Sequence, residues 1–182
     1  MQIAVGRSRK ATDWRVVTTS WEKLTKKLAS TKVTNETHEE YLAMSKEEQD
    51  TIKDVGGFVG GYLSAPRRKA ENVAYRTLLT LDMDYGGSVE LITAKYPETE
   101  LVIYSTHKHI PEKPRLRLVM PLSRNVSREE YEAIGRKVAE TIGIELFDDS
   151  SYQAERLMYW PSTPKDVEFL YHHQEGLQLR LS

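Results

Sequence analysis

The sequence contains no cysteine and no long apolar run. Without cysteine, its 182 residues can form neither a disulfide nor a thiolate metal site. No apolar stretch approaches the roughly 20 residues that cross a bilayer, and residues 1–7 lack the apolar core of a signal peptide. We therefore expect a cytoplasmic protein that has no membrane partner.

The sequence also lacks an excess of charge of either sign. Charged residues make up 29% of the chain, yet the formal net charge is only −1. Binding of nucleic acid would therefore require a local basic patch. The length suits one domain, and no internal repeat divides it. We expect a single domain over residues 1–182, with an N-terminal unit at 1–72 and a core at 73–172.

An acidic pair at the end of an apolar run is the most informative stretch. Residues 78–81 are apolar or threonine, Asp82 and Asp84 follow, and Gly86 and Gly87 end the run. On a strand, alternate side chains point to the same face, so the two carboxylates repel each other unless a cation lies between them. Oxygen ligands suit Mg²⁺ or Mn²⁺. The alternative is an ordinary strand end whose aspartates form a turn.

Periodicity and capping signals predict an α+β fold. In the first third we expect strands at 2–6 and 14–18, a helix capped by Ser20, and short helices at 41–44 and 46–53. The glycine-rich residues 56–63 match no phosphate-binding loop and suggest close backbone packing. The core reads as a split β-α-β arrangement with a mainly antiparallel sheet and helices on one face. Its strands are expected at 73–84, 101–105, 115–122, 144–147, 156–161 and 167–171, and its helices at 89–96 and 128–142.

Polar groups end three different core elements. Ser105 and His107 follow the second core strand, and Asp148 and Asp149 follow Phe147. Arg115 and Arg117 alternate on the intervening strand. Carboxylates that hold divalent cations, with a histidine and arginines that bind phosphate oxygens, are typical of a site for a nucleoside triphosphate.

These motifs resemble those of the archaeo-eukaryotic primase superfamily. Residues 82–86 look like its first motif, a hydrophobic strand that ends in Asp-x-Asp. Residues 105–107 look like its small-x-His motif, and residues 147–148 look like its hydrophobic-Asp motif. The closer resemblance, over roughly residues 56–165, is to the primase-polymerase-like domain of phage and mobile-element replication proteins, including the virulence-associated E group. Residues 105–118 and 156–162 carry that closer resemblance.

The resemblance implies a role for each group. The metals, Mg²⁺ or Mn²⁺, would be bound by Asp82, Asp84 and either Asp148 or Asp149, with Asp148 preferred. Ser105 and His107 would contact the triphosphate, assisted by Arg117 or Arg115. The fold would have an RNA-recognition-like core, and a 3′-hydroxyl would attack the α-phosphate and release pyrophosphate. Implied partners are nucleoside triphosphates, a single-stranded DNA template and a replicative helicase, and the basic residues that could reach the template are Arg67, Arg68 and Arg156.

A rolling-circle-type nicking endonuclease is one alternative function. His107 and His109 form a His-x-His pair at a strand end, and Tyr131 would be the nucleophile. The lysine between the histidines and the inward face predicted for Tyr131 both disfavour this reading.

A non-catalytic module that binds nucleic acid or a replication protein is the other alternative. Basic segments at residues 7–10 and 67–69 would contact phosphates, and bases would stack on Tyr62, Tyr152 or Trp160.

Overall fold

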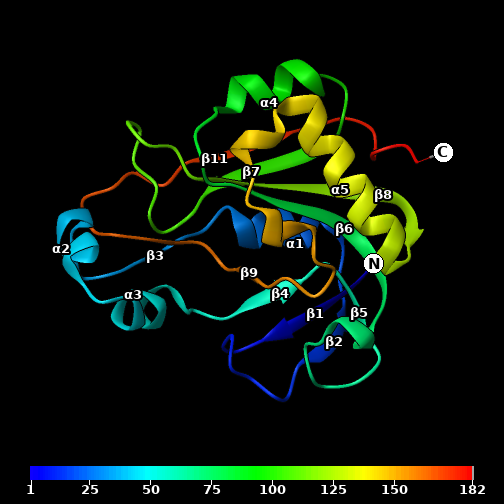
Figure 1. Cartoon of the computed structure of the whole chain (residues 1–182), viewed down its shortest axis with the longest axis horizontal. Helices are drawn as coiled ribbons and strands as arrows, with labels where there is room; N and C mark the ends of the chain where they lie inside the picture. Colours follow the sequence, from blue (N-terminus) through cyan, green and yellow to red (C-terminus); the bar gives the residue numbers. More distant parts are fainter. Residues whose placement is uncertain (182) are drawn as a thin grey trace.

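A five-stranded antiparallel sheet forms the centre of the protein, whose computed structural model describes residues 1–181 (Figure 1). The strand order is β11-β7-β8-β6-β5, with bounds Tyr171–Gln174, Leu101–Ser105, Leu116–Val126, Val73–Met83 and Gly61–Leu63. Since β6 and β7 both run antiparallel to β8, they are parallel to each other with β8 between them. This is the expected split β-α-β core, and the α+β fold class is confirmed.

Two helices cover one face of this sheet, as α4 (Val89–Lys95) and α5 (Arg128–Ile142) show in Figure 1. Ser127 and Glu130 form the capping box that begins α5, and Gly143 ends the helix at a φ of 147°, where a side chain would be strained. Leu79 and Leu81 of β6 pack into the core beneath these helices. The adjacent residues of β6 therefore point to the opposite face.

The N-terminal residues cover that opposite face. A second sheet has the order β2-β1-β4-β9, with bounds Arg15–Thr18, Gln2–Gly6, Gly57–Val59 and Met158–Tyr159. This sheet and α1 (Trp21–Leu28) share a core with the main sheet, in which Leu24, Phe58 and Leu78 are buried. Helices therefore lie on both faces of the main sheet, whereas the sequence predicted them on one.

Short elements complete the chain. They are β3 (Lys32–Val33) with its parallel partner β10 (Ser162–Thr163), α2 (His38–Ala43), α3 (Lys46–Lys53), and the 3₁₀ turns Ala70–Asn72, Ile144–Leu146 and Asp149–Tyr152. The glycine-rich segment packs closely, as expected, because a Cβ at Gly61 would collide with the carbonyl oxygen of Tyr75. Within residues 1–181, no helix has the length and apolar character that crossing a bilayer requires.

Three strand predictions near the C-terminal end were wrong in position. Residues 144–147 include a 3₁₀ turn, and two backbone hydrogen bonds join this segment to the end of β6 and the residue after it, from the Asp148 N–H to the Asp82 carbonyl and from the Tyr85 N–H to the Leu146 carbonyl. The strand predicted at 156–161 is limited to Met158–Tyr159 and joins the second sheet. The edge strand begins at Tyr171, because a turn closed by the Val167 N–H and the Pro164 carbonyl precedes it.

Arg76 ties the core strand to two neighbouring segments. Its side chain is fully buried, and no carboxylate pairs with it among residues 1–181. The guanidinium donates to the carbonyl oxygens of Gly60 (2.9 Å), Ala154 (2.7 Å) and Leu78 (3.0 Å). It also lies 3.9 Å from the centroid of the Tyr131 ring. Carbonyl dipoles and the ring thus replace a counter-ion.

We predict that Arg76→Ala lowers the free energy of unfolding by about 3–5 kcal/mol, because it leaves buried carbonyls unpaired and opens a cavity. Urea denaturation followed by circular dichroism measures the change. Arg136→Ala, which removes a half-exposed arginine from α5, is the control and should unfold close to the wild type. Equal midpoints for Arg76→Ala and the wild type would contradict this account.

Candidate functional site

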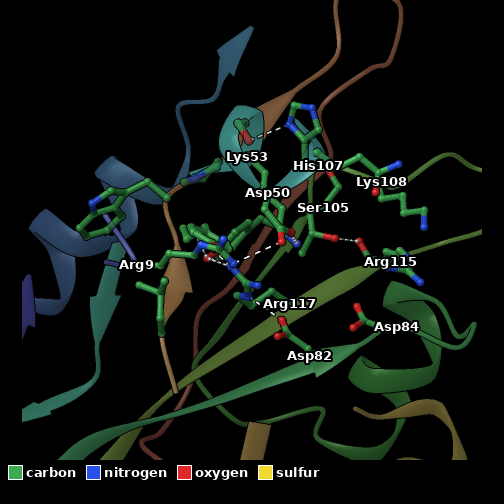
Figure 2. A pocket seen from close by; sticks show the side chains of 18 of the residues that line it. Arg9, Asp50, Lys53, Asp82, Asp84, Ser105, His107, Lys108, Arg115 and Arg117 are labelled. Carbon is green, nitrogen blue, oxygen red and sulfur yellow. Dashed lines mark hydrogen bonds and ion pairs between the residues drawn. The ribbon is translucent and has the colours of Figure 1, made fainter. Parts of the chain in front are cut away.

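A cavity of about 510 Å³ opens beside the ends of β6, β7 and β8 (Figure 2). Its walls come from distant parts of the chain, namely the ends of the core strands, helices α2 and α3, and residues 156–162. In Figure 2, Asp82 and Asp84 lie on one side and His107 lies on the other. Groups that the sequence separates by more than 20 residues therefore face one space.

Three carboxylates meet at the edge of this cavity. Asp82, Asp84 and Asp148 each offer an oxygen, and these oxygens all lie within 4.8 Å of one another. Asp82 ends β6, Asp84 follows on the same face, and the Asp148 N–H is bonded to the Asp82 carbonyl at 2.9 Å. The structure thus brings together the two sequence motifs that supply acidic residues.

Asp82 is held in a buried row across three strands. It lies opposite Arg117 on β8, and Arg117 lies opposite Tyr104 on β7. Arg117 donates from Nε to Asp82 Oδ1 at 2.6 Å and from Nη1 to the Tyr159 carbonyl at 3.0 Å. The ion pair raises the pKa of Arg117 despite its burial. Arg117 is therefore committed to Asp82 rather than left free in the cavity.

Asp84 is the uncompensated member of the trio. Burial, reinforced by the nearby charge of Asp82, raises the pKa of Asp84 to about 6. A divalent cation would relieve both costs, because it replaces the lost hydration and offsets the repulsion. The donor set and its electrostatics therefore suit an oxygen-bound metal.

The structure distinguishes Asp148 from Asp149. Asp148 caps the 3₁₀ turn by accepting from the Ser150 N–H at 3.1 Å and the Ser150 hydroxyl at 2.9 Å, and it lies 3.8 Å from Arg156. Asp149 is exposed and lies outside the carboxylate cluster. Of the two hypotheses for the third metal ligand, Asp149 is therefore weaker than Asp148.

His107 lines the cavity between two residues that the sequence did not suggest. Its Nδ1 lies 2.8 Å from Ser162 Oγ. Its Nε2 lies 3.6 Å from Glu36 Oε2, beyond hydrogen-bond distance, so Nε2 and Glu36 Oε1 are buried without a partner among residues 1–181. Burial lowers the pKa of His107, while the Glu36 carboxylate opposes that shift. Burial thus favours the neutral ring, while the adjacent carboxylate favours its charged form.

Ser105 and Arg115 also line the cavity, and they differ in how many of their hydrogen-bonding groups are already in use. The Ser105 hydroxyl oxygen accepts from the Leu170 N–H at 2.9 Å. One of its hydrogen bonds therefore holds the C-terminal segment. The Arg115 guanidinium makes no hydrogen bond or ion pair within the described chain. Of the two arginines proposed from sequence, Arg115 is the one whose donors are available to a ligand.

The cavity is strongly basic in a chain of nearly balanced charge. Only Asp50, Asp82 and Asp84 contribute acidic side chains to its lining. Eight basic residues line it: Arg9, Lys46, Lys53, Arg68, Lys108, Arg115, Arg117 and Arg156. Arg9 belongs to the basic segment 7–10 that the binding-module alternative named, whereas Lys46 and Lys53 were not predicted site residues, because they belong to an ordinary charged run whose orientation only the fold reveals.

The remaining candidates divide between the cavity and the rest of the surface. Arg68 and Arg156 line the cavity, whereas Arg67 is exposed elsewhere. Arg68 donates to the Glu155 carbonyl at 2.9 Å. Trp160 lines the cavity, while the other proposed stacking residues do not, since Tyr62 stacks on Tyr75 and Tyr152 is buried under Arg136.

Tyr131, the nucleophile named for the nicking-endonuclease alternative, does not line the cavity. Tyr131 is fully buried, and its hydroxyl is bonded to the backbone of Thr80 under the sheet. His109 does not line the cavity, and its Nδ1 accepts from the Arg115 N–H at 3.0 Å. The residues that this hypothesis requires are therefore not brought together.

Fold and site together define an α+β domain whose core sheet presents a carboxylate cluster to a basic cavity. The chain belongs to the VapE N-terminal domain family, whose sequence pattern matches residues 1–181. The resemblance to the virulence-associated E group is thereby confirmed. Among solved structures, the chain is similar to the AEP domain (PP-N190) of the cyanophage S-2L primase-polymerase (PrimPol), with 8% identity, 98% of this chain and 83% of that chain covered, and a TM-score of 0.48. Comparison with curated protein sequences gives no significant match.

We predict that Asp84→Asn stabilises the protein at pH 8 but much less at pH 4. With a folded-state pKa of about 6 and an ordinary value of 3.8, Asp84 binds its proton more tightly in the folded state. Its contribution to stability is therefore lost as pH rises from about 4 to about 6. At pH 8 the variant should gain about 1–3 kcal/mol, measured by urea denaturation. Asp149→Asn, the exposed neighbour of the cluster, should show no such pH-dependent gain, and a flat difference for Asp84→Asn would refute the assignment.

We also predict that Glu36→Gln lowers the pKa of His107 further, because it removes the carboxylate that favours the imidazolium. A titration of the His107 ring by NMR measures this shift. Glu39→Gln, an exposed change in α2, should leave the titration unchanged. A rise in the His107 pKa in Glu36→Gln would show that the carboxylate does not act on the ring.

Proposed function

We propose that this domain is a metal-dependent nucleotidyltransferase that makes or extends nucleic acid on a single-stranded DNA template. The observation that supports this proposal most directly is the meeting of three carboxylates at the edge of a basic cavity. Membership of the VapE N-terminal domain family agrees with a role in the replication of a phage or mobile element. The single primase-polymerase-like domain, with its N-terminal unit at 1–72 and core at 73–172, is part of the same proposal.

Asp82, Asp84 and Asp148 would hold Mg²⁺ or Mn²⁺. When bound, the metal neutralises phosphate charge and orients the attacking and leaving oxygens. Asp84 contributes a carboxylate that is ionised above about pH 6 and has no ion-pair partner within residues 1–181. Asp82 accepts from Arg117 through Oδ1, and this bond fixes the orientation of its carboxylate.

The incoming nucleoside triphosphate would bind across the cavity. Arg115, Lys108 and Lys53 offer cationic donors along its lining. Lys53 Nζ lies 3.4 Å from Asp50 Oδ1, and burial lowers the pKa of Lys53, so a phosphate oxygen beside it would favour its charged form. A triphosphate beside His107 would also favour the protonated ring, together with Glu36. These groups bind and orient the phosphates and exclude water around them.

The template would lie on the side of the cavity lined by Arg68 and Arg156, with Trp160 available for stacking. A replicative helicase that supplies single-stranded DNA is the proposed protein partner. The same geometry accommodates primer extension and the first joining of two nucleotides, because both reactions place a 3′-hydroxyl against an α-phosphate.

The decisive experiment is primer extension on single-stranded DNA with Mg²⁺ or Mn²⁺. We expect Asp84→Asn to lower the rate by at least about 100-fold, because it removes a ligand of the metal on which charge neutralisation depends. The fold should survive, since this change relieves repulsion. Asp149→Asn is the matched control and should retain the wild-type rate. Full activity of Asp84→Asn with both metals would overturn the proposal.

A further inference from the structure

A second hollow, of about 840 Å³, lies next to the cavity on the same side of the core sheet. Its floor is the face of the second sheet where Val5 of β1 lies opposite Arg15 of β2, and where Ile3 lies opposite Val17. Its wall is α1, which Figure 1 shows between the core sheet and β1 and β2. We call this hollow the outer groove.

The outer groove is basic along its wall and apolar on its floor. Lys23 and Lys27 of α1 and Arg15 of β2 line it, and none of the three pairs with a carboxylate within residues 1–181. The one acidic lining residue, Asp13, is paired with Arg7 at 2.9 Å. The unpaired charge facing this space is therefore entirely positive, which suits a chain of phosphates.

Trp160 connects the outer groove to the cavity, because its side chain lines both. Its ring stacks on Phe58 at a centroid distance of 4.9 Å and an angle of 26°. Lys27 Nζ lies 4.5 Å from the centroid of the same ring. The indole is thus supported by an aromatic neighbour and covered by a cation that a phosphate would attract.

We propose that the outer groove binds single-stranded nucleic acid, and that the strand passes over Trp160 into the cavity. Its phosphates contact Lys23, Lys27 and Arg15, and a base stacks on Trp160 as Lys27 turns toward a phosphate. The apolar floor accepts unpaired bases, which a duplex keeps inside its stack. The identification of this strand as the template rests on the proposed function, whereas the binding of a single strand does not.

The test is the binding of a fluorescent oligothymidylate of about 12 nucleotides, a length within the range that a single-strand site occupies. The measurement uses the Asp84→Asn protein without metal or triphosphate, so that binding is separated from catalysis. The double variant Lys23→Glu/Lys27→Glu should bind at least about tenfold more weakly and show a shallower dependence on salt. The charge-matched control is Lys26→Glu/Lys137→Glu. Lys26 lies on the same helix but outside the groove, and Lys137 lies on α5. This control should bind like its parent.

Two further measurements test the nature of the ligand. Binding should quench tryptophan fluorescence in the parent, and Trp160→Leu should abolish the quench and weaken binding by about 5- to 100-fold. A duplex of the same length and polyglutamate of matched charge should compete poorly. If the duplex or polyglutamate competes as well as the single strand, the groove is not a site for single-stranded nucleic acid and the inference is overturned.

The outcomes separate this inference from the proposed function. In an otherwise wild-type background, Lys23→Glu/Lys27→Glu should raise the KM for template in primer extension and leave the KM for triphosphate unchanged. If the wild type extends no primer but its oligothymidylate binding depends on Lys23 and Lys27, the proposed function fails and the groove stands. If extension is normal and the double variant binds like its control, the groove is refuted and the proposed function stands.

Discussion

The buried ion pair between Asp82 and Arg117 is the interaction on which the site depends. A carboxylate at this depth loses its hydration and needs a facing cation to offset that loss, and the strand register places Arg117 opposite it. The pair holds Arg117 on Asp82, whereas Asp84 forms no ion pair within residues 1–181, and the charges of Arg115 and Arg117 offset only part of the effect of its burial. One interaction therefore produces both a fixed carboxylate and a free one. A metal site needs both kinds of carboxylate. The fixed one, Asp82, sets the geometry, and the free one, Asp84, carries a negative charge that a cation would balance.

Residues 156–163 join the core to the N-terminal layer and carry three contacts of the site. The Tyr159 carbonyl accepts from Arg117, Ser162 bonds to His107, and Trp160 lies where the cavity and the outer groove meet. This segment can reach all three because it leaves the core sheet and pairs with β4 and β3 instead. Arg76 anchors its beginning through the Ala154 carbonyl. The position predicted for a strand of the core is thus taken by a connector between layers.

Sequence reasoning identified the residues that act through their own type and position. Asp82 and Asp84 alternate at the end of an apolar run, and that pattern predicts one shared face without further knowledge. Asp148 was preferred over Asp149, whereas the choice between Arg115 and Arg117 stayed open, because it depends on the contact of Arg117 with the carboxylate of Asp82. Glu36 was missed since nothing near it in sequence marks it, and Ser162 was given no role although it lies in the stretch 156–162 that carries the resemblance, because only folding brings the two to His107. The strand predicted at 144–147 was wrong because the segment turns on itself, with the Leu146 and Phe147 N–H groups bonded to the Gly143 and Ile144 carbonyls, which its apolar composition does not indicate.

The N-terminal third belongs to the chemistry of the site as much as to its support. Without residues 1–72 the chain would keep the three carboxylates, but the cavity lining would lack Arg9, Lys46, Lys53 and Arg68, and His107 would lack Glu36. The remaining lining would carry four basic residues against Asp82 and Asp84, and the outer groove would lose its floor and wall. A cluster of carboxylates binds a metal with a triphosphate only where enough positive charge surrounds the phosphates. The boundary at residue 72 thus divides the sequence only. The basic residues on which the proposed activity depends come from both sides of it.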